Sequence, residues 1–407
     1  MTGHFVGAYK AFAANGASGA PPWLKDMRER AIARFAEVGF PTRRLEQWRF
    51  TNVEPISETP FELQRSTWEL DPVPAGVTVS TLSATVATAP DFLQVHLGRY
   101  ADVATNPFTA LSTAFLADGI VIRVAARTVV PDPIRVRCRI PRAALPMTHP
   151  RLLIVLEREA QAKIVEAYEG DAGGASLTNA VTEAVLEEGA QLELCREQRE
   201  GAPSNHVAAS HFHQARDSRL VFTTVALGAG LARHDIHGVL DGSNAYLILN
   251  GLSVLGGRQH VDHHTTIDHA EPHCESHEYF NGVFDGESRG VFNGRIIVRP
   301  GAQRTDSKQT NNNLLLSREA RADSQPQLEI YADDVKCTHG STVGPLDPTA
   351  LFYLRSRGLG AAEARGLLTY GFGAEILDRI AVPGARARLD REIRERLGVP
   401  ESAGTAA

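Results

Sequence analysis

The central part of the chain carries short alternating or β-branched segments and shows little helical periodicity. Turn signals such as Asp241-Gly242-Ser243 and Pro300-Gly301 separate these segments, several of them roughly 12 to 16 residues apart. Spacing of this kind is typical of a β-solenoid or a β-sandwich, and the periodicity alone does not choose between them. The clearest predicted strands are Ile120–Val124, Ile134–Ile140, Leu152–Leu156, Leu220–Ala226, Tyr246–Leu249 and Gly294–Val298.

Helical patterns flank this β region on both sides. Apolar residues recur at helical spacing from Pro22 to Gly39, and Asp347-Pro348 combines an N-cap residue with a proline at the first helical position. We predict helices from this proline to about Arg357, over residues 361–380 and over residues 385–397. The chain then divides into a helical or mixed N-terminal region (1–118), a β core (119–345) and a helical C-terminal region (346–407).

The composition is that of a folded globular protein. Of the 407 residues, 43% are hydrophobic and 22% are charged, unlike disordered chains or membrane proteins. A net charge of −6 disfavours a general role in nucleic-acid binding, and no apolar stretch is long enough to span a membrane. The four cysteines form no Cys-x-x-Cys pair, so we expect no zinc finger or ferredoxin-type cluster held by this chain alone. The N-terminus lacks an apolar core of signal-peptide length, so we expect a cytoplasmic protein with reduced thiols.

The segment Asp333–Gly340 holds the first candidate for chemistry. In an extended conformation Cys337 and His339 point to the same face, and a thiol beside an imidazole suits a soft metal ion. Val335 shares that face and favours its burial, either inside the fold or against a partner subunit. The alternative is a buried thiol and a hydrogen-bonded histidine in the last turn of a solenoid.

A second candidate is the histidine-rich segment from His260 to His269. As a strand, it places two histidines and two aspartates on one face, an arrangement that can bind a divalent ion. Its spacing matches no standard metalloenzyme signature, so structural or interface histidines are the alternative. The candidate ligands are His260, Asp262, His264 and Asp268.

Three other features bear on ligand binding. The polar run Gln309–Asn313 is interpreted as a turn whose asparagines satisfy backbone groups, in preference to a binding loop. No Gly-x-x-x-x-Gly-Lys-Ser/Thr motif occurs, so we expect this chain alone to bind no nucleotide, and an ATP-driven role requires a partner with a P-loop. The run from Arg386 to Arg396 reflects a composition of 37 arginines and five lysines better than it indicates a phosphate site.

Several stretches resemble the SufB and SufD family of iron–sulfur cluster assembly scaffold proteins, and most of all its SufD members. They are Gly290–Gly294, Gln303–Asn313, Gln327–Cys337, Ala350–Gly358 and the N-terminal motif that runs from Pro41-Thr42-Arg43 to Trp48. The resemblance implies a mainly β fold. It consists of a right-handed parallel β-helix core flanked by N-terminal and C-terminal α-helical regions.

The resemblance also implies a function and partners. A SufD-like chain is a non-catalytic scaffold that pairs with a SufB-like paralogue and binds a SufC-like ATPase through its C-terminal helices, and the complex assembles iron–sulfur clusters. An iron or a transient cluster is expected at a subunit interface, with His339 and, less strongly, Cys337 as candidate ligands. The predicted ATPase contacts lie on the helix that begins at Pro348: Leu351, Phe352, Tyr353, Leu354, Arg355 and Arg357.

We expect the contact with the SufB-like partner just before Cys337. The candidate residues are Asp333, Asp334, Val335 and Lys336. A solenoid leaves strand edges or a flat face free for pairing, so the same surface offers a route to a homodimer in isolation. Two enzymatic alternatives stay open: a β-solenoid carbohydrate-active enzyme, which requires paired acidic residues on a groove, and a histidine-rich metallohydrolase, which requires metal bound to the isolated chain.

Overall fold

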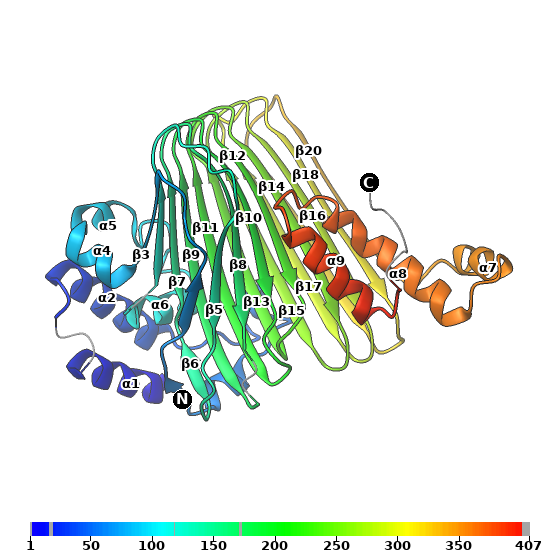
Figure 1. Cartoon of the computed structure of the whole chain (residues 1–407), viewed down its shortest axis with the longest axis horizontal. Helices are drawn as coiled ribbons and strands as arrows, with labels where there is room; N and C mark the ends of the chain where they lie inside the picture. Colours follow the sequence, from blue (N-terminus) through cyan, green and yellow to red (C-terminus); the bar gives the residue numbers. More distant parts are fainter. Residues whose placement is uncertain (1, 16–18, 118, 171–172, 401–407) are drawn as a thin grey trace.

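Most strands of the protein belong to two long sheets that face each other (Figure 1). The structure, a computed structural model, describes residues 2–15, 19–117, 119–170 and 173–400. The predicted N-terminal region therefore includes residues 1, 16–18 and 118 that lie outside this description, and the predicted C-terminal region includes residues 401–407.

One sheet has 11 strands and the other has 9 within the described residues. The strands of the first are β1 (Glu62–Leu63), β3 (Val77–Thr81), β4 (Ile120–Val124), β6 (Pro146–Thr148), β7 (Arg151–Leu156), β9 (Ser176–Leu186), β11 (Ser204–Gln214), β13 (Leu231–Leu240), β15 (His260–His269), β17 (Arg289–Val298) and β19 (Arg321–Ile330). The strands of the second are β2 (Thr67–Leu70), β5 (Ile134–Arg139), β8 (Gln161–Glu169), β10 (Gln191–Gln198), β12 (Arg219–Ala226), β14 (Tyr246–Leu255), β16 (Glu275–Phe284), β18 (Asp306–Leu315) and β20 (Lys336–Gly344).

From β7 to β20 the chain alternates between the sheets for most of its course, so each strand pairs in parallel with the one a full coil earlier. Leu231 pairs with His260, and His260 pairs with Arg289, in steps of about 30 residues. The antiparallel pairs are β2 with β5 and β3 with β4, at the start of the sheets. Because the long ladders are parallel and repeat coil by coil, the fold is a β-solenoid and not a sandwich.

Side chains that point between the two sheets form the main core. Alternation along β4 and β7 buries Ile122 and Ile154 there, and Leu194 and Phe222 face them from the other sheet. Polar groups also enter this space, including the buried ion pair of Arg196 with Glu166.

The N-terminal region covers the outer face of the 11-stranded sheet. In one cluster Phe35 and Phe108 pack against Val207, and in a second cluster Leu93 packs against Leu153. The region is mixed, as expected, since it contributes β1 to β3 as well as helices. Its helices are α1 (Thr2–Asn15), α2 (Pro22–Val38), the 3₁₀ turn η1 (Glu46–Trp48), α3 (Glu54–Glu58), α4 (Leu82–Thr88), α5 (Pro90–His96) and α6 (Pro107–Ala114).

The C-terminal helices cover the outer face of the 9-stranded sheet. Ile376 and Leu389 pack there against Leu252 and Val283. The helices are α7 (Pro348–Ser356), α8 (Ala361–Leu377) and α9 (Ala385–Arg396), close to the three predicted ranges. In the described part of the chain, no helix is long and apolar enough to cross a membrane.

Candidate functional site

The last coil of the solenoid ends at two free strand edges. β19 and β20 are the terminal strands of their sheets, so within the described residues no further strand pairs with their outer edges (Figure 1). At this end the side chains of Ile330, Tyr331 and Val343 are exposed, Tyr331 by 61%. Free backbone edges beside exposed apolar side chains are features of a strand-pairing interface. We call this surface, made of β19, β20 and these three side chains, the open end.

Cys337 and His339 lie on β20, on the side that faces the other sheet. The parallel register places Cys337 beside Ser307 and His339 beside Gln309. The side chains of Ser307 and Gln309 are buried between the sheets. Because aligned residues of parallel strands point the same way, Cys337 and His339 line the mouth of the solenoid interior at the open end.

The two residues differ in how far the last coil covers them. Cys337 is half-buried and, like Val335, packs against a small buried cluster that includes Ile296. Burial raises the pKa of its thiol, and the carboxylate of Asp306 adds to the increase. His339 is exposed, and its side chain makes no hydrogen bond or ion pair with any residue that the structure describes. A metal ion or a partner can therefore reach the imidazole directly.

Polar side chains fill the solenoid interior behind the open end. Gln309 Nε2 donates a hydrogen bond of 2.8 Å to Glu278 Oε1, and Asn311 Nδ2 donates one of 3.2 Å to the carbonyl of Phe280. A Cβ atom at Gly294 on the opposite sheet would lie 2.1 Å from Gln309 Nε2, so glycine makes room for this amide. Burial raises the pKa of Glu278 to about 7, although its hydrogen bonds act in the opposite direction.

The turn expected at Gln309–Asn313 is wrong. The run lies inside strand β18, and alternation directs Gln309, Asn311 and Asn313 into the solenoid. There the amides satisfy backbone groups and one another, as when Asn313 Nδ2 donates to Asn311 Oδ1 at 2.7 Å. The sequence analysis identified the backbone-satisfying role of the asparagines but placed them in the wrong element.

The predicted partner contacts before Cys337 lie at one corner of the open end. Asp333, Asp334 and Val335 lie in the turn between β19 and β20, and Lys336 begins β20. The carbonyl of Asp334 accepts a hydrogen bond of 2.6 Å from the Arg304 amide, which fixes the turn on the preceding coil. The side chains of Asp333, Asp334 and Lys336 are exposed, whereas Val335 is half-buried.

Sequence reasoning missed the exposed apolar residues of the open end. Tyr331 follows β19 directly, and Val343 lies near the end of β20. A signal for them was present, because each is an apolar position between the last predicted strand, Gly294–Val298, and the helix predicted from Pro348, where no later strand is predicted to cover it.

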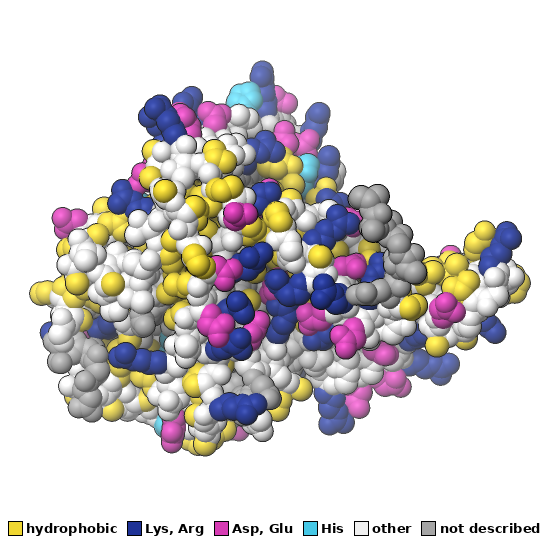
Figure 2. Space-filling model, in the orientation of Figure 1, with side chains coloured by type: hydrophobic (Ala, Val, Ile, Leu, Met, Phe, Trp, Pro, Cys, Tyr) yellow, Lys and Arg dark blue, Asp and Glu magenta, His cyan; other side chains and the backbone are white. Residues whose placement is uncertain are grey.

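Helix α7 projects from the body and buries none of its residues (Figure 1). The Asp347 carboxylate caps it by accepting a hydrogen bond of 2.8 Å from the Thr349 amide. Phe352 is 73% exposed and Tyr353 is 55% exposed, and Figure 2 shows hydrophobic side chains gathered over this projection. The other predicted contacts are half-buried (Leu351 and Leu354) or exposed (Arg355 and Arg357). An apolar helix surface left free in this way suits a helix-in-groove contact.

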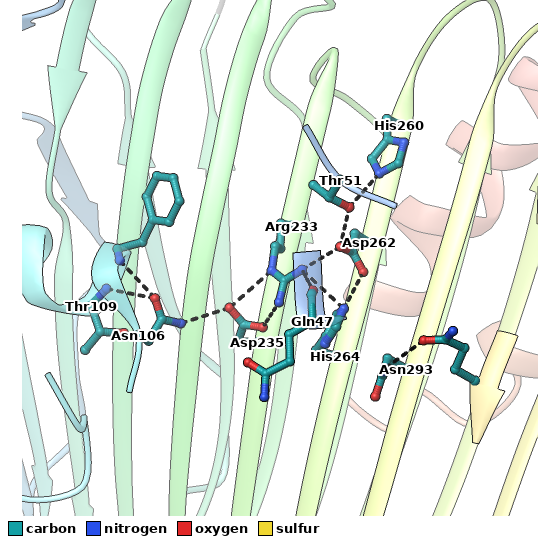
Figure 3. A network of polar contacts seen from close by, with 12 residues as sticks. Gln47, Thr51, Asn106, Thr109, Arg233, Asp235, His260, Asp262, His264 and Asn293 are labelled. Carbon is teal, nitrogen blue, oxygen red and sulfur yellow. Dashed lines mark hydrogen bonds and ion pairs between the residues drawn. The ribbon is translucent and has the colours of Figure 1, made fainter. Parts of the chain in front are cut away.

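The histidine-rich segment is strand β15, with the two faces that alternation predicts. His263 and His269 point into the solenoid, where burial lowers the pKa of each to about 4 and leaves the imidazoles uncharged at neutral pH. His260, Asp262 and His264 lie on the outer face, against the N-terminal segment (Figure 3).

Arg233 of β13 is the centre of the polar network in Figure 3. Its guanidinium lies 2.8 Å from Asp235 Oδ1 and 2.7 Å from Asp262 Oδ2, and it donates a hydrogen bond of 2.8 Å to the Gln47 carbonyl. The same group stacks on the ring of Trp48. Burial alone would lower the pKa of Arg233, but the two aspartates hold it above its ordinary value.

The four candidate metal ligands take part in ion pairs and hydrogen bonds with other side chains of the protein. Thr51 donates to Asp262 and lies 3.0 Å from His260 Nε2, while His264 Nε2 lies 3.0 Å from Asp262 Oδ1. Asp268 is separate and pairs with Arg299 at 2.7 Å. Groups of three or more His, Cys, Asp or Glu side chains placed to hold a metal ion do not occur among the described residues. The hydrogen bonds of Thr51 with His260 and Asp262 hold the N-terminal segment against the outer face of the sheet.

Comparison with known proteins adds the family context. The model described as "SUF system FeS cluster assembly, SufBD core domain" matches residues 139–372, and that of the SufBD protein N-terminal region matches residues 2–72 and 64–136. An iron–sulfur cluster assembly SufBD family protein of Synechocystis sp. is 31% identical over 406 residues, covering 90% of this chain and 89% of its own length. The iron–sulfur cluster assembly protein SufD of Escherichia coli is 33% identical over 249 residues, covering 61% and 59% respectively. The protein of the same name from Bacillus subtilis is 23% identical over 413 residues, covering 93% and 94%.

Proposed function

Because the chain belongs to the SufBD family of iron–sulfur cluster assembly proteins, we propose that it is a SufD-type scaffold that pairs with a SufB-like paralogue through its open end. The observation that carries this proposal is the pair of free edges on β19 and β20 beside exposed Tyr331 and Val343. A related solenoid with matching edges can continue both sheets across the contact. In isolation the same end can pair with a second copy of this chain.

A SufC-like ATPase is the second partner in this proposal. The chain contains no P-loop, so ATP hydrolysis has to come from another subunit. Exposed Phe352 and Tyr353 on α7 offer the apolar contact, and Arg355 and Arg357 add positive charge beside it. The projection of α7 from the body leaves these side chains accessible to a docking groove.

The iron or nascent cluster is the cargo of the proposed complex. An imidazole binds iron, and thiolates of a partner can complete a mixed nitrogen–sulfur site. His339 fits this role because it is exposed at the mouth of the open end and has no other partner among the described residues. Cys337 is the weaker candidate, since burial raises the pKa of its thiol and so disfavours the thiolate that binds metal.

The scaffold role accounts for the fold without either enzymatic alternative. A carbohydrate-active enzyme requires paired carboxylates on a groove. In the cleft lined by Arg233, Asp235 and Asp268, however, Asp235 is paired with Arg233 and Asp268 with Arg299. A metallohydrolase requires a ligand set, and the histidine-rich strand uses its outer face to hold the N-terminal segment.

The proposal is tested by producing the chain together with the SufB-like and SufC-like proteins of its own organism and measuring the mass of the purified complex. We expect one complex that contains all three proteins. Val343→Asp should remove the SufB-like subunit, because it places a charge on the apolar part of the open end, whereas Val129→Asp, at another exposed valine, should not. A monomer without affinity for the SufB-like protein would refute the scaffold role.

A further inference from the structure

The N-terminal motif from Pro41 to Thr51 has two structurally distinct parts. Trp48 and Thr51 are buried and hold the segment on the sheet through Arg233 and Asp262. The arginines of this segment are exposed instead, so their presence is not explained by packing against the sheet. Arg43, Arg44 and Arg49 border one cavity with a volume of about 730 Å³, which we call the arginine pocket.

Among the residues that the structure describes, no acidic side chain forms an ion pair with any of the three arginines. The Nε atom of Arg43 donates a hydrogen bond of 3.2 Å to the Arg49 carbonyl, and the Arg49 guanidinium lies 5.6 Å from the ring centroid of Phe50. Arg44 makes no polar contact within the part of the chain that the structure describes. The pocket lining contains one carboxylate, that of Glu54, so positive charge predominates.

Two arginines near the C-terminus are paired with acidic residues. In the run that begins at Arg386, Arg386 pairs with Asp378 and Arg394 pairs with Asp390 at 2.8 Å. That run is therefore structural, as its composition indicated. The arginine pocket differs because three arginines line one cavity and none of them has an ion pair within the described residues.

We propose that the arginine pocket binds a small phosphate-bearing ligand. Guanidinium groups bind phosphate oxygens through paired, charge-assisted hydrogen bonds, and several of them around one cavity favour a multiply charged anion. The volume lies within the range of about 300–1,000 Å³ that is usual for small-molecule sites. Phe40 and Pro41 add apolar surface for the uncharged part of such a ligand, and Asn52 adds an amide.

The concave shape and the overall charge select a small molecule in preference to nucleic acid. A nucleic-acid surface extends along a basic face, whereas here the unpaired cations surround a single cavity in a chain with a net charge of −6. The pocket is built from the motif, the start of α1 and α3, and it contains no residue of the open end or of α7. This inference is therefore independent of the proposed scaffold function.

Isothermal titration calorimetry of the full chain with pyrophosphate tests the proposal. We expect saturable binding, weakened by roughly tenfold or more in both Arg44→Ala and Arg49→Ala, because each loses charge-assisted hydrogen bonds. Arg30→Ala is the matched control, since this exposed arginine pairs with Asp26 on α2 and does not border the pocket. Unchanged thermal midpoints of the variants show that the fold is intact.

Three results would overturn the phosphate site. One is the absence of a pyrophosphate signal up to millimolar concentration in the unaltered chain. Another is an affinity that stays the same in Arg44→Ala and Arg49→Ala. The last is citrate binding as tightly as pyrophosphate, which would assign the pocket to carboxylates.

Discussion

The Arg233 guanidinium lies over the indole of Trp48, with its central carbon 3.7 Å from the ring centroid. Trp48 in turn stacks on Phe108 at a centroid distance of 5.5 Å. One buried cation therefore joins the 3₁₀ turn η1, helix α6 and strand β13. The N-terminal layer and the solenoid are coupled through this contact.

Replacing Arg233 should destabilise the whole chain. Arg233→Ala leaves Asp235 and Asp262 buried without their counter-ion, and we expect a loss of about 3–5 kcal/mol in the free energy of unfolding, measured by urea denaturation. The exposed pair of Arg258 with Glu287 provides the control, where Arg258→Ala should cost less than about 1 kcal/mol. Equal effects of the two substitutions would contradict the structural role of Arg233.

Glu278 should make the protein less stable as the pH rises. Burial raises its pKa in the folded state to about 7, so the folded protein holds the proton more tightly than the unfolded chain. Its contribution is fully present below the ordinary glutamate pKa and is lost as the pH rises through 7. Glu278→Gln should therefore raise the thermal midpoint relative to the unaltered chain at pH 8 and change it little at pH 4. The same shift at both values would exclude the titration of this group.

His339 should affect cargo and leave assembly intact. In the complex with its partners, His339→Ala should lower the recovered iron and sulfide by roughly half or more, because the mixed site loses one ligand. Cys337→Ala should have a smaller effect if the working thiolates lie on the partner. His273→Asn serves as the control, since it removes another exposed imidazole and asparagine tolerates the φ of 62° at that turn. Full iron and sulfide content in the His339→Ala complex would show that His339 is not a ligand of the iron or cluster.

Phe352 should be a main determinant of ATPase affinity. Phe352→Ala should weaken binding to the SufC-like protein by about 2 kcal/mol, or roughly 30-fold, in a calorimetric titration. The fold should not change, because the side chain is 73% exposed. Leu45→Ala, at a leucine 53% exposed in the N-terminal region, should bind as the unaltered chain does.

Charge reversal at Arg355 and Arg357 gives a second test of the same helix. The double change to glutamate should weaken the complex more at low salt than at high salt, since exposed charges are screened by ions. Unchanged affinity in all α7 variants would move the ATPase contact to another surface.

Strands with a simple alternation could be predicted from the sequence. The predicted segment Ile120–Val124 coincides with β4, and Tyr246–Leu249 falls within β14. Strands β9 and β11 gave no such signal because buried polar residues, such as Glu183 in β9 and His211 in β11, interrupt their apolar positions. Helix α6 was missed for another reason: all of its residues except Pro107 are buried, so it has no exposed polar face.

The features of the open end could be predicted only where the residues involved are close together in the sequence. The common face of Val335 and Cys337 follows from alternation, and it agrees with the packing of both side chains against the same buried cluster. The exposure of His339 depends on the absence of a following coil, which is a property of the whole solenoid. The contact of Trp48 with Arg233 joins distant parts of the chain, so a single sequence does not indicate that these two residues meet.

That distance also has a consequence during synthesis of the chain. The hydrogen bond of Thr51 with Asp262 spans 211 residues, so its acceptor leaves the ribosome long after its donor. At a translation rate of about 5–20 residues per second, the N-terminal segment waits roughly 10 to 40 s for the strand that receives it. During this interval Trp48 and its aromatic neighbours lack the surface that later buries them. The N-terminal segment is thus synthesised early but gains its contacts with Arg233 and Asp262 only after β13 and β15 have formed.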